Sequence, residues 1–290
     1  MSVTEKTIRT RYADIALSQS SGAGLPVLLL HGSGASKGVF AKQFAGPLAD
    51  THRMLAIDLP GHGQSSDAFD PAATYTVAGL ALVVAEVLGE LGIDRAAVFG
   101  WSLGGHVAIE LLSFHAGIAG LLLTGTPPIG RGPIGVLRGF HTSLDVMLAS
   151  KERFTARDIE RFARMCFGDH VDPAFLLSIA RADGRLRKIV FNGMMRGIGA
   201  DQKRVVEHAS VPIAIVNGER EPVGRLGYIA SLAYSSLWDG QCHVIPGAGH
   251  APFWEMPDAF NPMLSRFVED VEAHEVAQVS REHERFARSA

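Results

Sequence analysis

The strongest chemical signal in this sequence is a serine set between glycines, in the pentapeptide Gly100-Trp101-Ser102-Leu103-Gly104. An apolar run from Ala96 to Trp101 precedes the serine, and a helical pattern from Leu103 to Phe114 follows it. A serine placed between a strand and a helix is typical of a nucleophile elbow, a strained turn that holds the hydroxyl above a sheet. The small flanking residues permit such a turn. We therefore predict that Ser102 is a nucleophile.

A serine hydroxyl attacks a carbonyl when a base removes its proton and an acid orients that base. His250 lies in a glycine-rich loop, Pro246 to Pro252, directly after the last predicted strand. The preceding strand is followed by Asn217 to Pro222, which contains two carboxylates, Glu219 and Glu221. We predict His250 as the base and Glu221, three residues after the turn glycine, as the acid, with Glu219 as the alternative.

The negatively charged oxygen of a tetrahedral intermediate needs backbone N–H donors. Leu103 is expected to supply one donor and Ser33, at the end of the first parallel strand, the other. Gly32, next to Ser33, and Trp101, next to Ser102, are predicted to contact the substrate. Three further histidines are interpreted as hydrogen-bonded scaffold residues, namely His31, His62 and His106.

The elements that must position these residues alternate between short apolar strands and longer helical patterns. That alternation is typical of an α/β fold with a mostly parallel central sheet flanked by helices. The predicted strands are Pro26 to His31, Arg53 to Asp58, Ala96 to Trp101, Gly120 to Gly125, Val211 to Asn217 and Cys242 to Pro246. The predicted helices outside the insertion described next are Val39 to Leu48, Val77 to Leu91, Leu103 to Phe114, Val223 to Ser235 and Pro257 to Val271.

The alternation of strands and helices stops between residues 127 and 210, where helical patterns occur without a strand. We predict a helical cap over 127–210, inserted between two parts of the sheet domain, 1–126 and 211–290, the second ending in a C-terminal helix. Most aromatic and Met side chains of the insertion are expected to pack it onto the sheet domain. We predict that Phe140, Phe154 and Phe162 line a pocket beneath the cap.

Composition excludes several classes of function. With 27 Lys plus Arg against 30 Asp plus Glu, the net charge is −3, so we expect no nucleic-acid partner. The two cysteines lie far apart, and the twelve histidines contain no HxHxDH ligand spacing, so we expect neither a metal nor another cofactor. No secretory h-region and no membrane-spanning stretch stand out, which favours a cytoplasmic protein without membrane insertion. Oligomeric state stays open.

These motifs in this order resemble the α/β-hydrolase superfamily over nearly the whole chain. Several segments further resemble the AidH-type N-acyl-homoserine lactone lactonases, from about Pro26 to Val268. The matching segments are Phe99 to His106, Thr124 to Pro128, Ala180 to Arg185, Val216 to Pro222 and Gly249 to Phe253. The resemblance implies a small-molecule ester or lactone substrate, and opening of the homoserine lactone ring by a metal-free serine mechanism that silences a quorum signal.

Two residues depart from that group. Ser33 stands where the group has Asn, a change that keeps the backbone amide donor. Phe162 stands where the group has a tyrosine that hydrogen-bonds the substrate, so one polar anchor worth about 0.5 to 1.5 kcal/mol is missing or replaced.

Other functions remain open at this stage. A general carboxylesterase needs the same triad with a different pocket, and a small-ligand receptor could retain the hydrolase scaffold. Epoxide hydrolases and haloalkane dehalogenases of this fold are disfavoured, because they use a carboxylate nucleophile where this chain has Ser102.

Overall fold

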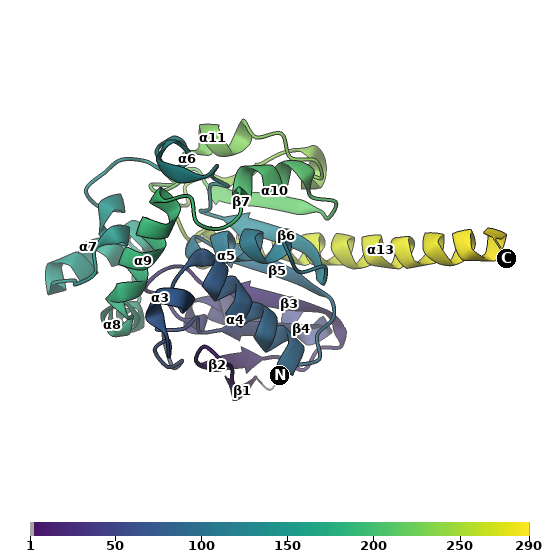
Figure 1. The fold of residues 1–290 in the computed structure, drawn as a ribbon, viewed down its shortest axis with the longest axis horizontal. Coiled ribbons are helices and arrows are strands. Elements are labelled where there is room, and N and C mark those ends of the chain that lie inside the picture. The colour runs from purple at the N-terminus through teal and green to yellow at the C-terminus, as the bar shows by residue number, and fades with distance from the viewer. Residues whose placement is uncertain (1–2, 290) are drawn as a thin grey trace.

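The computed structural model describes the backbone of residues 3–289 and the side chains of residues 3–277. In this part of the chain an eight-stranded sheet has the order β1-β2-β4-β3-β5-β6-β7-β8 (Figure 1). β1 pairs with β2, and β2 with β4, in the antiparallel sense, and all later pairings are parallel. The strands are β1 (Thr4–Arg9), β2 (Asp14–Gln19), β3 (Gly24–Leu30), β4 (His52–Ile57), β5 (Ala96–Trp101), β6 (Ile118–Thr124), β7 (Ile213–Gly218) and β8 (His243–Ile245).

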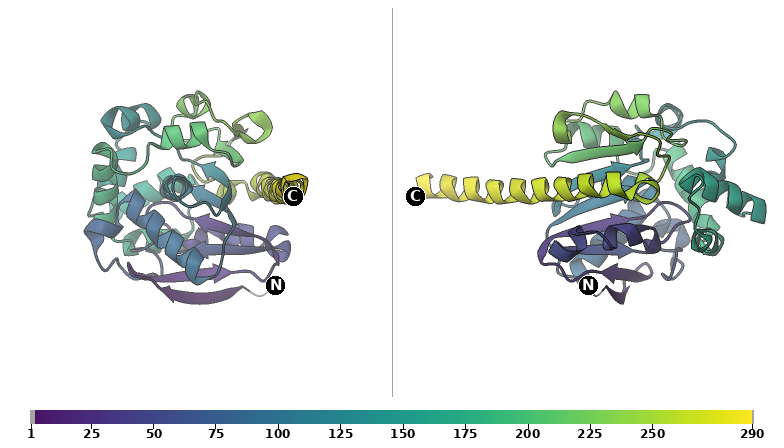
Figure 2. Two further views of the ribbon diagram at one scale, coloured as in Figure 1. Left: turned by 45° about the vertical axis from the view of Figure 1, so that its right-hand side comes forward. Right: turned by 180° about the vertical axis from the view of Figure 1, so that it is seen from behind.

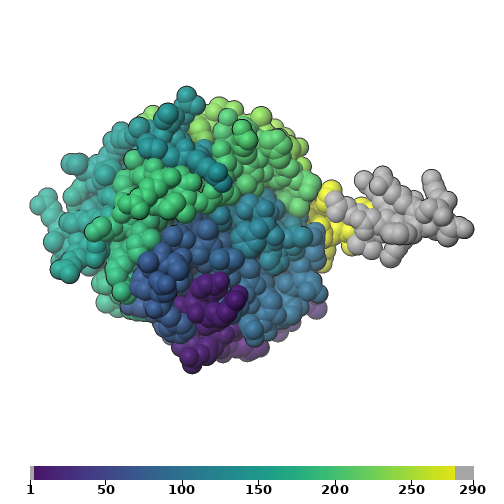
Figure 3. Space-filling model, in the orientation of Figure 1, coloured from purple at the N-terminus to yellow at the C-terminus, as the bar shows by residue number. Residues whose placement is uncertain are grey.

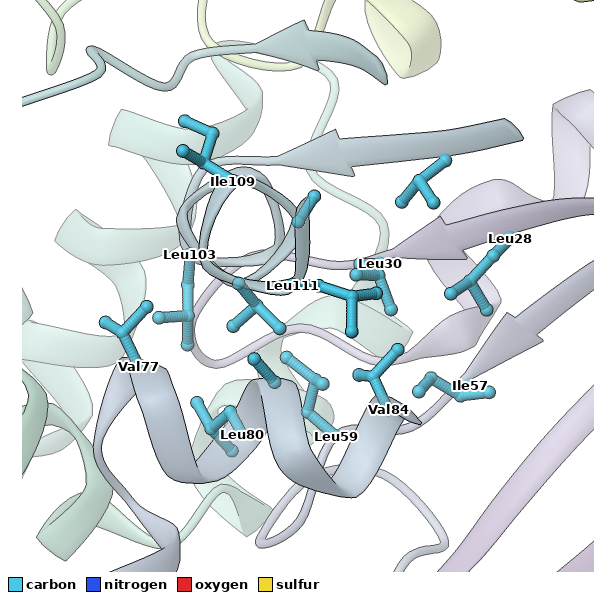
Figure 4. Packing of buried hydrophobic residues seen from close by; sticks show 14 of the residues in the cluster. Leu28, Leu30, Ile57, Leu59, Val77, Leu80, Val84, Leu103, Ile109 and Leu111 are labelled. Atoms are coloured by element: carbon cyan, nitrogen blue, oxygen red, sulfur yellow. The ribbon is translucent and has the colours of Figure 1, made fainter. Parts of the chain in front are cut away.

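The sheet is buried on both faces, which explains why its inner strands read as unbroken apolar runs. Successive side chains of β3 belong to two different cores: Leu28 and Leu30 to one, and Val27 and Leu29 to the other. The first core is closed by α4 (Val77–Glu90) and α5 (Leu103–Leu112), as Figure 4 shows. The second core is closed by α12 (Pro252–Glu255) and the apolar residues at the start of α13 (Pro257–Ser289), which lies on the other side of the sheet (Figure 2).

The predicted α/β class and mostly parallel sheet are confirmed, and β5 begins and ends where the sequence places it. Two predicted helices are wrong in extent. The first is divided into three short pieces, with Gly46 and Pro47 between the second piece and the third. The second predicted helix shrinks to α11 in a stretch that contains Gly224 and Gly227. The observed elements are η1 (Lys37–Phe40), α1 (Ala41–Phe44), α2 (Leu48–Thr51) and α11 (Leu226–Ala230), and two further short helices are α3 (Pro71–Thr74) and η3 (Trp238–Gly240).

Residues 127–210, all of which the structure describes, contain helices and no strand. Several of these helices begin at a side chain that accepts hydrogen bonds from the first turn, as Thr155 and Asp183 do. The helices of this segment are α6 (Gly132–Gly139), η2 (Val146–Ser150), α7 (Ala156–Phe167), α8 (Pro173–Arg181), α9 (Gly184–Met195) and α10 (Gln202–His208). In Figure 1 α7, α8 and α9 lie at the end of the sheet away from the C-terminal helix, where Figure 3 shows teal and green atoms, whereas α10 lies beside β7.

No helix in the described part of the chain is both long and apolar enough to cross a membrane.

Candidate active site

Ser102 forms a sharp turn between β5 and α5. Its φ of 53° and ψ of −117° lie in a region that residues with a side chain rarely occupy. A Cβ atom on Gly100 would lie 2.5 Å from Cα of Gly105, and one on Gly104 would lie 2.0 Å from a carbonyl oxygen of β3. The helix therefore packs on the strand backbone at distances that glycine alone allows, which is the physical content of the GxSxG pattern.

Glu221 and His250 form a buried pair. His250 Nδ1 lies 2.8 Å from both carboxylate oxygens of Glu221. The N–H groups of Val223 and Gly224 donate to Glu221 Oε1 at 2.7 and 3.0 Å. Burial alone would raise the pKa of the Glu221 carboxyl, but the imidazole and these two N–H groups together hold that pKa below its ordinary value. Glu221 is thus ionised at neutral pH and can hold the proton of His250 on Nδ1.

The His250 loop and the Ser102 turn meet at Gly125. The N–H of Ser102 donates to the carbonyl of Thr124 at 2.9 Å, and a Cβ on Gly125 would lie 2.5 Å from Cε1 of His250. Trp101 Nε1 donates to the carbonyl of His250 at 2.8 Å. Ser102 Oγ makes no hydrogen bond to a residue in the described part of the chain. The bond between a nucleophile and its base is often long until substrate binds.

The two carboxylates that the sequence offered as the acid differ in position. Glu219 is exposed, and its Oε2 accepts a hydrogen bond from the N–H of Gly247, whereas Glu221 contacts His250. Sequence reasoning missed a third carboxylate, Glu255. The N–H groups of Gly249 and Ala251 donate to its two oxygens at 2.8 and 3.0 Å, so Glu255 fixes the loop on both sides of His250. Its place at the end of the short helix after the histidine was the available signal.

The two predicted oxyanion donors face one cavity together with Ser102. Leu103 is the first residue of α5, so its N–H has no carbonyl acceptor within the helix. Ser33 follows β3, and its buried Oγ lacks a hydrogen-bond partner among the described residues. The next residue, Gly34, donates its N–H to His62 Nε2 at 3.0 Å, which fixes the loop.

His31 and His62 are buried next to this loop, with ring centroids 5.0 Å apart. His31 Nε2 accepts a hydrogen bond from the N–H of Leu59 at 3.0 Å. Burial lowers the pKa of both imidazoles, which keeps them neutral and able to accept these bonds. Both residues hold the loop in place.

The cavity above Ser102 has a volume of about 340 Å³ and an apolar lining. Beside Ser33, Ser102 and Leu103, the lining residues come mainly from α6, η2, α9 and the loops next to them. They are His106, Val136, Leu137, Phe140, His141, Thr142, Val146, Met147, Ala149, Leu186, Arg187, Val190, Phe191, Met194, Met195 and Val223.

Of the five residues predicted to bind substrate, Phe140 lines this cavity and four do not. Trp101 is buried against Phe167 and Phe253, and Gly32 packs against Trp101. The other two, Phe154 and Phe162, pack on each other with ring centroids 5.3 Å apart. The guanidinium of Arg187 covers Phe154, and Phe162 rests on Gly34. Phe162 lies on the amphipathic helix α7, whose apolar side packs into the second core together with Phe154, so these two side chains do not line the cavity as the sequence predicted. Contact of Gly32 and Trp101 with the substrate stays a prediction.

Over residues 3–277, no group of three or more His, Cys, Asp or Glu side chains is arranged to hold a metal ion.

A family model described as the alpha/beta hydrolase family matches residues 27–263. The chain belongs to the alpha/beta hydrolase family. Within it, the chain is 31% identical to the pimeloyl-[acyl-carrier protein] methyl ester esterase of Xanthomonas axonopodis pv. citri, over 86% of this chain and 97% of that one.

The chain is also similar to solved structures of the N-acyl homoserine lactonase AidH. One, complexed with N-butanoyl homoserine, is 42% identical with a TM-score of 0.90, over 92% of this chain and 97% of AidH. Another is a serine-to-glycine mutant complexed with N-hexanoyl homoserine lactone, 41% identical with a TM-score of 0.90, over 92% of this chain and 98% of that one. The expected resemblance to AidH within the alpha/beta hydrolases is thereby confirmed.

Proposed function

We propose that this hydrolase is a serine carboxylic ester hydrolase that opens the lactone ring of N-acyl-homoserine lactones, and so quenches a quorum signal. The observation that carries the proposal is the likeness to AidH over more than nine-tenths of the chain, in a molecule whose Ser102 turn lies beside a buried His–Glu pair. The AidH complexes hold the intact lactone in a mutant that has lost a serine, and the ring-opened acid in another complex.

In the proposed reaction, Ser102 Oγ attacks the lactone carbonyl carbon while His250 Nε2 takes the hydroxyl proton. Glu221 holds the other imidazole proton on Nδ1 and stabilises the imidazolium that forms. Collapse of the tetrahedral intermediate breaks the ring C–O bond, and His250 returns the proton to the departing oxygen. The product at this stage is a Ser102 ester whose released hydroxyl belongs to the same acyl group.

The second half of the reaction uses the same groups. His250 takes a proton from water, the water oxygen attacks the Ser102 ester, and the serine leaves with the proton from His250. The released molecule is the N-acyl homoserine carboxylic acid. In both halves the negative oxygen would lie between the N–H groups of Leu103 and Ser33, donors that cost little reorganisation because α5 and the His62-braced loop already fix them.

A general carboxylesterase is the second candidate, favoured by the likeness to the Xanthomonas methyl ester esterase. It would use the same residues on an open ester.

The test is product analysis by mass spectrometry with N-acyl-homoserine lactones and matched acyl methyl esters, for wild type and Ser102→Ala. We expect each lactone to gain one water in the wild type, with sustained turnover, and nearly all activity to vanish in folded Ser102→Ala. Turnover of methyl esters without ring opening would replace the lactonase with the carboxylesterase. A single burst of product without further turnover would favour a ligand receptor.

A further inference from the structure

His106 is a buried imidazole in the wall of the cavity that the reaction scheme above does not use. It lies on α5, one helical turn after Ser102, and its side chain is 3% exposed. Four residues of helix rise about 6 Å, and helical side chains tilt toward the N-terminus, which here is the serine end. The imidazole therefore projects toward the space in front of Ser102.

The hydrogen bonds around His106 determine which ring nitrogen carries the proton. Gln202 Nε2 donates to the carbonyl of His106 at 3.4 Å, which turns Gln202 Oε1 toward the ring. That oxygen can only accept, and it lies 2.7 Å from His106 Nδ1, so the proton resides on Nδ1. Nε2 then bears a lone pair, and no described residue occupies it with a hydrogen bond. The imidazole thus offers the cavity an acceptor.

The charge state of His106 keeps this acceptor available. Burial lowers the pKa of His106 to about 4, and the bond to Gln202 opposes the shift without cancelling it. The other ionisable side chains lining the cavity are His141 and Arg187, and Glu110, one turn further along α5, accepts a bond from the N–H of Ala200. None of these three side chains hydrogen-bonds the His106 ring within the described residues, so the ring stays neutral and its Nε2 stays an acceptor at neutral pH.

We propose that His106 Nε2 accepts a hydrogen bond from an N–H on the carbon next to the attacked carbonyl, so that His106 selects α-acylamino lactones and esters. The inference rests on the proposed function. In such a substrate the nitrogen is two bonds from the carbonyl carbon that Ser102 attacks. The Cβ atoms of residues four positions apart on a helix lie about 5 to 6 Å from each other. At this distance His106 Nε2 can accept the hydrogen bond of the amide N–H while the N–H groups of Leu103 and Ser33 bind the carbonyl oxygen.

The consequence is discrimination against an isosteric substrate that lacks the donor. Replacing the amide N–H by an ester oxygen leaves the chain length and the ring unchanged. It places a lone pair of that oxygen next to the lone pair of His106 Nε2, where the two repel. Sites that hydrogen-bond a substrate N–H reject such analogues because a buried group is left unpaired. We expect the wild type to open N-hexanoyl-homoserine lactone at least about tenfold faster, in kcat/KM, than α-hexanoyloxy-γ-butyrolactone.

The experiment measures lactone-ring opening of these two substrates by mass spectrometry, and the ratio of their kcat/KM values is the readout. His106→Phe removes the acceptor, so the ratio should fall to about 1 through loss of the amide rate. Phe140→Leu is the matched control, because Phe140 lines the same cavity with its ring 5.6 Å from that of His106. It should leave the ratio within about twofold of wild type.

A second variant keeps the imidazole and changes its proton. Gln202→Glu places a carboxylate beside His106 Nδ1 and so favours the protonated ring. At low pH Nε2 then carries a proton and becomes a donor. The kcat/KM ratio should then fall as pH decreases from 8 to 5, whereas the wild-type ratio should stay flat because the lowered pKa of His106 keeps its Nε2 an acceptor over this range.

A ratio in His106→Phe equal to that of wild type overturns the proposal, as does a ratio in Gln202→Glu that does not change with pH. If the wild type opens neither lactone but hydrolyses open esters, the proposed function fails instead. The same ratio measured with the methyl esters of N-hexanoyl homoserine and of 2-hexanoyloxy-4-hydroxybutanoic acid then tests His106 separately.

Discussion

Replacement of Glu221 by glutamine changes one atom of the acid and should reverse the proton arrangement of His250. Glu221 Oε1 accepts from the N–H groups of Val223 and Gly224, while the carboxylate also accepts from His250 Nδ1. In Glu221→Gln the amide oxygen must stay on the two backbone donors, so its NH₂ group faces His250. Nδ1 must then accept, the proton moves to Nε2, and Ser102 has no base.

The magnitude follows from those two backbone bonds. Returning His250 to the productive tautomer requires the glutamine to turn over and leave two buried N–H groups unpaired. Each costs about 1 to 3 kcal/mol, so the barrier rises by about 2 to 6 kcal/mol, equivalent to roughly 30-fold to 2 × 10⁴-fold in rate. The equivalent change in Ser-His-Asp enzymes lowers kcat about 10⁴-fold, which supports the upper end.

The assay is initial-rate hydrolysis of the best lactone or ester substrate, with circular dichroism to show that the variant is folded. Glu219→Gln is the matched control: the same chemical change two residues away, on an exposed carboxylate that bonds Gly247. It should stay within about twofold of wild type. A folded Glu221→Gln within tenfold of wild type, or an equal loss in Glu219→Gln, would refute the assignment of the acid.

Three further predictions follow from the site and its surroundings. Because the proposed reaction needs Ser102, His250 and backbone donors, a fluorophosphonate should label Ser102 and abolish hydrolysis, while EDTA should leave the rate of hydrolysis unchanged. Loss of activity in EDTA that added zinc restores would contradict this. The apolar lining should favour longer acyl chains by up to about fourfold per buried methylene, and Val190→Phe, which fills the cavity, should move the optimum to shorter chains in a kcat/KM series. Burial lowers the pKa values of His31, His62 and His106, so below the ordinary histidine pKa of about 6.5 the unfolded chain binds more protons than the folded one. Urea unfolding should therefore show the free energy of unfolding falling as pH drops below that value, by up to about 1.4 kcal/mol per pH unit for each histidine. The fall should be less steep in His62→Gln, which removes one of the three histidines.

The nucleophile turn could be read from the sequence because it depends on neighbours in the chain. Gly100 and Gly104 are needed at short backbone contacts around Ser102, and such requirements appear as residue types at fixed spacing. The same holds for the parallel strands, whose apolar runs reflect burial on both faces. The spacing after the turn glycine favoured Glu221 but left Glu219 as the alternative, because the contact of the acid with His250 depends on how two loops that follow different strands meet.

The cavity wall was harder to predict because it is made by helices whose rotation is set by long-range packing. Phe140 and Phe162 are both aromatic residues of the same insertion, yet one faces the cavity and the other the second core. A local signal existed for Phe162: with Ala163, Cys166 and Phe167 it forms the buried stripe of an otherwise charged helix. A stripe spaced in this way is typical of a core contact rather than a ligand contact.

On the proposed function, the geometry divides substrate recognition between two parts of the molecule. Ser102 precedes α5 directly, and the Leu103 N–H and His106 Nε2 belong to its first turn, so their spacing is set by helix geometry and by the glycines that fix the Ser102 turn. The acyl chain would instead meet side chains of α6 and α9, whose identity can change without disturbing that turn. Changes in the 127–210 segment should therefore alter chain-length preference more readily than preference for the head group, because head-group recognition shares its scaffold with the nucleophile.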